Sequence, residues 1–174
     1  MKYVLLHKQG NAAFPKDDEV SQNFLTRQVY KIPVDYRCFL FERMENENSL
    51  EGDKPVVYDL KHDKASIEHI MPQTLSVEWK RELGNDYEGI QDMYLHTFAN
   101  LTLTGYNGNY SNQKFSVKKK SHIDKDGNKI FGYDESKYNL SDYLKTIDEW
   151  TEKETRIQVN NATASNKRNA TSRV

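Results

Sequence analysis

Two short apolar segments, each with polar residues at its ends, constrain the fold of this chain more than any other feature. In the first, residues 66–71, apolar and polar residues alternate up to Pro72. The second, residues 101–104, has a period of two and ends at Gly105. This alternation is typical of β-strands, and proline and glycine are common where strands end. The sequence therefore predicts two short strands.

The first predicted strand carries two adjacent residues that suit catalysis. Glu68 is a hard oxygen ligand of the kind that Mg²⁺ and Mn²⁺ bind. His69 has a side chain whose ordinary pKa, about 6.5, suits a general base at neutral pH. Neighbours on a strand point to opposite faces, so both can serve one site only if the backbone bends, and Pro72 favours such a bend. An isolated Glu-His pair is otherwise an ordinary surface feature.

Asparagines surround the second predicted strand. They are Asn100, Asn107, Asn109 and Asn112. Asparagine is common in turns and helix caps, which accounts for one or two of them. Their clustering after a Glu-His strand favours a small metal-dependent phosphodiesterase site.

Three blocks in this region resemble a known family. They are IEHIMPQ at 67–73, NLTLTGYN at 100–107 and SNQKF at 111–115. In this order they are similar to the HNH-type nuclease domain at the C-terminus of GmrSD-like proteins, which are bacterial modification-dependent restriction enzymes. The resemblance extends from about residue 14 to residue 150 and is strongest from 67 to 119.

The resemblance implies an α+β fold, a mainly helical domain built around a ββα-metal (His-Me finger) core. Two strands and a helix would bind one divalent cation, Mg²⁺ or Mn²⁺. His69 matches the general base, and Glu68 matches the acidic metal ligand before it. Asn100 matches the central asparagine that orients the imidazole. Asn107 and Asn112 both match positions for the last metal ligand, and the sequence does not choose between them.

The function implied is a metal-dependent DNA endonuclease, the cutting module of a bacterial restriction system for phage defence. Its DNA substrate would in some cases carry modified bases. Family members place a nucleotide-hydrolysing regulatory domain before the nuclease, and this sequence has no Gly-rich phosphate loop of the P-loop kind. We therefore expect the regulator in another domain or subunit. The alternatives are a catalytically silent nucleic-acid-binding or assembly module of the same fold, and RNA as the substrate.

Composition is consistent with this interpretation but does not establish it. The 174 residues suffice for one domain, and no apolar run approaches the length of a membrane helix. We therefore expect a cytoplasmic protein without a membrane partner. The single cysteine, Cys38, excludes a Cys-rich zinc knuckle and favours a buried apolar role.

Lysines crowd the segment beside the proposed site although the net charge of the chain is only −1. The relevant ones are Lys114, Lys118, Lys119 and Lys120. They lie on a helix predicted over 111–120. Such a cluster can contact nucleic-acid phosphates, and the alternative is a solvated helix face.

The rest of the chain predicts supporting structure. We expect a helical lead-in subdomain at 1–63, the nuclease domain with a C-terminal helix at 64–158, and a disordered tail at 159–174. The lead-in contains a helix from Asp17 or Asp18 to about Tyr30, and a second that starts near Pro33. A brief strand is predicted at 56–58.

Further helices and a hairpin are predicted around the two strands. A helix at 77–83 is capped by Ser76 and ended by Gly84. A second helix runs from 86 to about 97, and we interpret His96 at its end as structural, with phosphate binding as the alternative. Asp126-Gly127 indicates a hairpin, and a last helix begins at Ser141. Residues expected to face inward are Phe41, Met44, Ile90, Met93, Tyr94, Phe98, Leu144, Ile147 and Trp150.

Overall fold

The computed structural model describes residues 19, 22–23, 26–46, 65–158 and 160–161. The strand predicted at 56–58, part of the first predicted helix and nearly all of the predicted tail lie outside these residues. The described end of that helix differs from the prediction, because residues 27–28 are not helical and Val29–Lys31 form a 3-10 turn. The described part contains helices and small antiparallel sheets, which confirms the α+β class. Among the described residues, no helix has the length and apolar character needed to cross a membrane.

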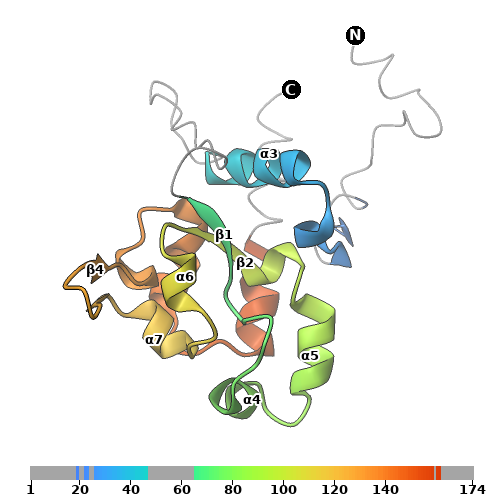
Figure 1. Ribbon diagram of the computed structural model, residues 1–174. Coiled ribbons are helices and arrows are strands. Elements are labelled where there is room, and N and C mark those ends of the chain that lie inside the picture. Colours follow the sequence, from blue (N-terminus) through green and yellow to red (C-terminus); the bar gives the residue numbers. More distant parts are fainter. Residues whose placement is uncertain (1–18, 20–21, 24–25, 47–64, 159, 162–174) are drawn as a thin grey trace.

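An antiparallel pair of strands lies at the centre of the molecule (Figure 1). Strand β1 (Ser66–His69) pairs with β2 (Leu101–Thr104), with Ser66 opposite Thr104 and His69 opposite Leu101. Both strands were predicted, although β1 ends two residues earlier than expected. Every residue of β2 is buried, because other elements cover both of its faces.

Helices α4 and α5 fill the connection between the two strands. In α4 (Val77–Leu83), the Ser76 hydroxyl accepts a hydrogen bond from the Trp79 backbone N–H at 3.4 Å, and Gly84 follows at φ 83°. The predicted cap and stop are thus confirmed. Helix α5 (Tyr87–Tyr94) is shorter than predicted, and the 3-10 turn η3 (Phe98–Asn100) leads from it into β2. Met93, expected inward, is 59% exposed because it lies on the solvent side of α5.

The single helix predicted over 111–120 is wrong. Helix α6 (Asn107–Tyr110) comes first, and α7 (Phe115–Lys119) follows after a turn. Ser111 within that turn has φ 45°, a left-handed conformation that cannot continue a right-handed helix. The break allows α6 to contact β1 while α7 runs separately beneath it.

The hairpin and the C-terminal segment follow. Strands β3 (His122–Ile123) and β4 (Lys129–Ile130) form the predicted hairpin, with Gly127 at φ 82° in its turn. Turn η4 (Tyr133–Glu135) comes next. Turn η5 (Asn139–Ser141) then leads into α8 (Asp142–Thr146). The last predicted helix therefore ends before Ile147, and a separate helical segment covers 152–158.

Two apolar clusters stabilise the fold. The larger cluster surrounds Trp79, Phe115, Tyr133 and Trp150, each of which has no exposed surface. The smaller cluster lies between β2 and α3 (Val34–Glu45), which crosses one end of the strand pair. Its Phe41 and Phe98 rings are 5.1 Å apart. Phe41 and Met44 are buried as predicted, whereas Cys38 is partly exposed.

Candidate active site

Strand β1 places its two candidate residues in different surroundings. Glu68 and His69 are 3% and 6% exposed. The Glu68 carboxylate meets Lys118 of α7, whereas the His69 ring meets Tyr30 and His96. Because successive side chains of a strand point to opposite faces, the separation follows directly from the extended backbone. The expected bend begins only after His69, where β1 ends.

On the first side, the Lys118 ammonium is bound by three oxygens. Its Nζ atom donates to Glu68 Oε1 at 2.6 Å, to the His69 carbonyl at 2.9 Å and to the Ile70 carbonyl at 3.1 Å. The Lys118 side chain has no exposed surface. Burial raises the pKa of Glu68 and lowers the pKa of Lys118, and the contact between the two groups opposes both shifts. Lys118 therefore does not belong to an exposed basic patch, which corrects that part of the prediction.

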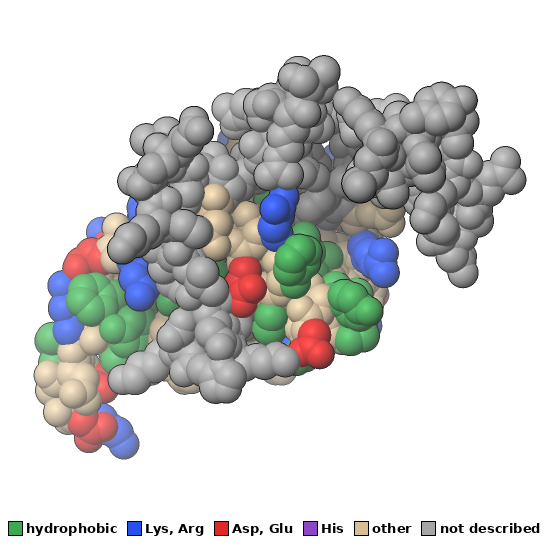
Figure 2. Space-filling view, turned by 90° about the horizontal axis from the view of Figure 1, so that it is seen from above, with side chains coloured by type: hydrophobic (Ala, Val, Ile, Leu, Met, Phe, Trp, Pro, Cys, Tyr) green, Lys and Arg blue, Asp and Glu red, His purple; other side chains and the backbone are tan. Residues whose placement is uncertain are grey.

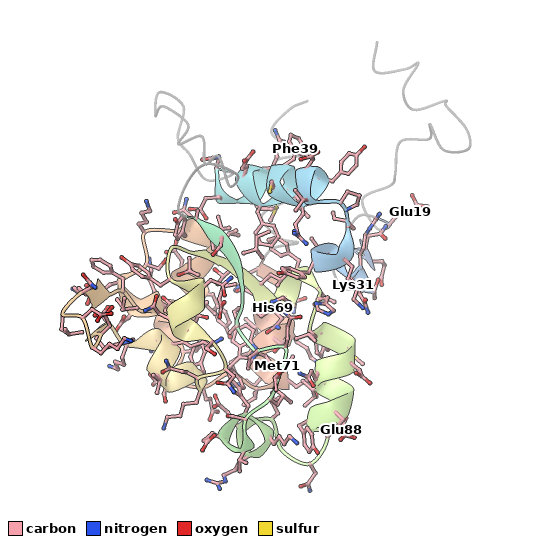
Figure 3. The ribbon with its side chains drawn as sticks, in the orientation of Figure 1. Glu19, Lys31, Phe39, His69, Met71 and Glu88 are labelled. Carbon is pink, nitrogen blue, oxygen red and sulfur yellow. The ribbon has the colours of Figure 1, made fainter. Side chains whose placement is uncertain are left out.

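On the second side, His69 lies in a group of aromatic rings near the middle of the molecule (Figure 3). Its Nε2 atom is 3.2 Å from Nδ1 of His96, and its ring centroid is 4.4 Å from that of Tyr30. Burial, followed by the charges of His96, Lys118 and Arg37, lowers the pKa of His69 to about 4. The ring is therefore neutral at pH 7, the protonation state in which imidazole can accept a proton.

The lead-in segment contributes to this second side. Turn η2 (Val29–Lys31) contains Tyr30, whose backbone N–H donates to the His96 carbonyl at 3.0 Å. Arg37 of α3 lies over the Tyr30 ring at 4.4 Å and donates to the Tyr30 carbonyl. Burial and the charge of Lys31 lower the pKa of His96. Sequence reasoning missed Tyr30 and Arg37, because nothing in the sequence links them to residues so distant along the chain.

Asn100 binds the bend after β1. Its Oδ1 accepts from the Met71 N–H at 2.8 Å, and its Nδ2 donates to the carbonyls of Met71 at 2.8 Å and Leu95 at 3.1 Å. The expected contact with the imidazole is replaced by these bonds, because the register sets Leu101 opposite His69 and brings Asn100 to the residues beyond it. Asn100 thus orients the loop that follows His69, and its role in catalysis stays a prediction.

The two candidate amide ligands differ in their attachment to β1. Asn107, at the start of α6, donates from Nδ2 to the Ile67 carbonyl at 3.1 Å, next to Glu68 in the strand. Asn112 is exposed in the turn between α6 and α7. Within the described residues, no three His, Cys, Asp or Glu side chains are grouped to bind a metal ion. A metal site built from the ligands that the sequence predicts would combine the Glu68 carboxylate with an amide oxygen.

The chemistry of these donors fits a magnesium-type ion. Mg²⁺ prefers oxygen ligands and is often bound through one or two carboxylates, with water completing its shell. The contact with Lys118 uses Oε1 of Glu68, and a carboxylate can accept at both of its oxygens. Asn107 donates its Nδ2 hydrogen to the Ile67 carbonyl, so its amide oxygen is the atom of this side chain that could bind a metal ion.

The four lysines of the predicted patch divide into two pairs. Lys118 and Lys119 are buried, and Lys119 donates to the Ile147 carbonyl at 2.6 Å and to Asp148 at 2.9 Å. Lys114 and Lys120 are exposed. Figure 2 shows that, on the face seen from above, basic side chains are scattered among acidic and apolar ones. A nucleic-acid contact from this segment would thus depend on Lys114 and Lys120.

Comparison with known proteins identifies the family. No curated protein and no solved structure gives a significant match to the chain. The family model of the C-terminal domain of GmrSD restriction endonucleases matches residues 14–161, which is most of the 174 residues. The chain therefore belongs to the family of GmrSD restriction endonuclease C-terminal domains.

Proposed function

We propose that this chain is an HNH-type DNA endonuclease domain that hydrolyses phosphodiester bonds with the help of a divalent cation. Membership of a restriction endonuclease family supports nuclease activity. One observation carries the proposal for this chain. His69, at the end of β1, is a buried and neutral imidazole, and the residue before it, Glu68, is a buried carboxylate.

In this proposal, His69 is the general base. Its ring accepts a proton from the attacking water, a step that contributes about 10²–10⁴-fold to such reactions. A pKa of about 4 in the free protein makes the ring a weak base, but a phosphate anion that binds nearby raises it. In the free protein, Nε2 of His69 faces Nδ1 of His96. When DNA binds, the attacking water would replace His96 as the partner of one ring nitrogen of His69, since either nitrogen of the ring can carry the proton.

The proposed metal ligands are Glu68 and an amide oxygen from Asn107 or Asn112. A bound Mg²⁺ or Mn²⁺ would supply stabilisation of the charge that develops on the phosphate and the leaving oxygen. Asn100 supports this arrangement from outside, because it secures the bend at Met71. Of the two amides, Asn107 is the one that the structure ties to β1, which favours it as the ligand.

DNA, modified in some cases, is the proposed substrate, and Lys114 and Lys120 are the proposed phosphate contacts. A nucleotide-hydrolysing regulator, as another domain or subunit, would select the DNA in a bacterial defence system located in the cytoplasm. The lead-in at 1–63 would support the nuclease at 64–158.

Nicking of supercoiled plasmid DNA in Mg²⁺ or Mn²⁺ tests the proposal. We expect His69→Ala to lower the rate by roughly 10²–10⁴-fold. The matched control is His122→Ala, because His122 is exposed on β3 and should leave the rate unchanged. Equal rates for wild type and His69→Ala would remove His69 from the mechanism.

The same assay separates the alternatives. DNA binding that survives chelation, without cleavage in any divalent cation, would indicate a silent binding or assembly module. Cleavage of an RNA hairpin in preference to the plasmid would change the substrate to RNA.

A further inference from the structure

The buried ammonium of Lys118 has no part in the function as described so far. A lysine without exposed side-chain surface is unusual, because burial of a charge is costly unless partners compensate it. Here the compensation is complete in number: an ammonium has three donors, and three oxygens within 3.1 Å receive them.

The identity of these oxygens is informative. One belongs to the carboxylate of Glu68, and the others are the carbonyls of His69 and Ile70. A single group on α7 therefore contacts the proposed metal ligand, the backbone of the proposed base and the first residue of the bend. Asn100 secures the other side of that bend through Met71.

We propose that Lys118 is a positioning residue for the hydrolysis, which orients the Glu68 carboxylate toward the metal and secures the backbone that carries His69. The inference rests on the proposed function. Ligating carboxylates are commonly oriented by a hydrogen-bond partner behind them, and loss of that partner typically lowers metal affinity or activity 10- to 100-fold. The Lys118 side chain has no exposed surface and its three donors all bind protein oxygens, so its proposed role is positioning and not catalysis.

The kinetic test is Lys118→Met, which keeps the length of the side chain and removes the charge. We expect kcat for plasmid nicking, per folded molecule, to fall about 10- to 100-fold with KM for DNA unchanged. The Mn²⁺ concentration for half-maximal activity should rise as well. Lys145→Met is the control, because Lys145 is partly exposed on α8 and forms an ion pair with Asp142 of the same helix.

Two results would overturn the proposal. A wild-type kcat per folded molecule would make Lys118 purely structural. A raised KM with unchanged kcat, together with weaker dependence on salt, would make it a DNA contact.

A second measurement does not depend on activity or on the folding of the Lys118 variant. In wild-type protein labelled with ¹⁵N-lysine, the buried ammonium should give a slowly exchanging NMR signal. Added Mn²⁺ should broaden this signal, and Glu68→Gln should prevent the broadening. A signal unaffected by Mn²⁺ would show that Lys118 and Glu68 do not adjoin a cation site.

The two measurements keep the proposals apart. If wild-type protein cleaves no nucleic acid in any divalent cation, the proposed function fails. Mn²⁺ broadening that depends on Glu68 would then still support the orienting role of Lys118 toward a metal.

Discussion

The two sides of β1 show how burial affects neighbouring ionisable groups differently. On the Glu68 side, a buried carboxylate meets a buried ammonium at 2.6 Å. On the His69 side, a buried imidazole meets a second imidazole and nearby positive charges, so its pKa falls to about 4. Burial disfavours the charged form of each group, and only Glu68 has an opposite charge in contact to offset it. One strand thus separates a buried ion pair from a neutral imidazole.

The largest effect should come from leaving the Glu68 side without its cation. Lys118→Ala strands a buried carboxylate, and removal of one partner of a buried pair destabilises a protein by about 3–5 kcal/mol. Chemical denaturation would measure the loss. The double variant Glu68→Gln with Lys118→Met should recover part of it, because no charge is left unpaired. A loss within error of zero would mean that water reaches the carboxylate.

The His69 side should respond to pH. Between pH 6.5 and about 4 the unfolded chain binds a proton at this residue and the folded protein does not, so stability falls as pH falls through this window. The full loss is about 3 kcal/mol, from 1.36 kcal/mol per pKa unit. Denaturation of wild type and His69→Gln at pH 7.5 and 4.5 measures most of this loss, which is complete only below the folded pKa of about 4. His122→Gln, on exposed β3, should keep the wild-type difference, and a difference that His69→Gln leaves unchanged would rule out this origin.

Asn100 should affect both sides together, because it secures the bend that follows them. Asn100→Ala leaves the buried N–H and carbonyl of Met71 without their partner, at a cost of roughly 1–3 kcal/mol. Thermal unfolding would detect the shift, with the exposed Asn109→Ala as control. Accelerated hydrogen exchange at Met71 should accompany it, and unchanged exchange would indicate that the bend is rigid without Asn100.

The smallest effect should come from an exposed ion pair. Lys129 and Glu135 are 2.6 Å apart, the same separation as Lys118 and Glu68, but nearly half of each side chain is exposed. Solvent screens such pairs, so Lys129→Ala should leave the unfolding midpoint unchanged within error. A shift as large as that of Lys118→Ala would show that distance, rather than burial, decides the contribution.

Local patterns predicted the local elements well. Period two gave both strands, Ser76 and Gly84 gave the ends of α4, and Asp126-Gly127 gave the hairpin. The predicted helix over 111–120 was wrong because the backbone conformation of a single residue ends one helix and separates it from the next. Ser111 at φ 45° divides the predicted helix over 111–120, and no residue type at that position signals the break.

The sequence indicated candidate site residues, whose roles stay predictions, but it did not indicate all of their partners. The sequence indicated Glu68, His69, Asn100 and Asn107, and the structure places all four on or against the strand pair. It did not indicate that Lys118 is buried, because a lysine in a run of lysines looks like part of a solvated face. Nor did it indicate the contact between His69 and His96, which depends on how the chain returns after α5.

The sequence by itself determined the family, the α+β class and the adjacency of a carboxylate and an imidazole on one strand, because these depend on residue order and period alone. Only the tertiary structure decided which partner each received. The partner of Glu68 comes from α7, and that of His69 comes from the segment after α5. Their packing brings Lys118 against Glu68 as a buried ion pair and keeps His69 neutral. Desolvation and contact with opposite charge are properties of packing in space, so no linear pattern records them.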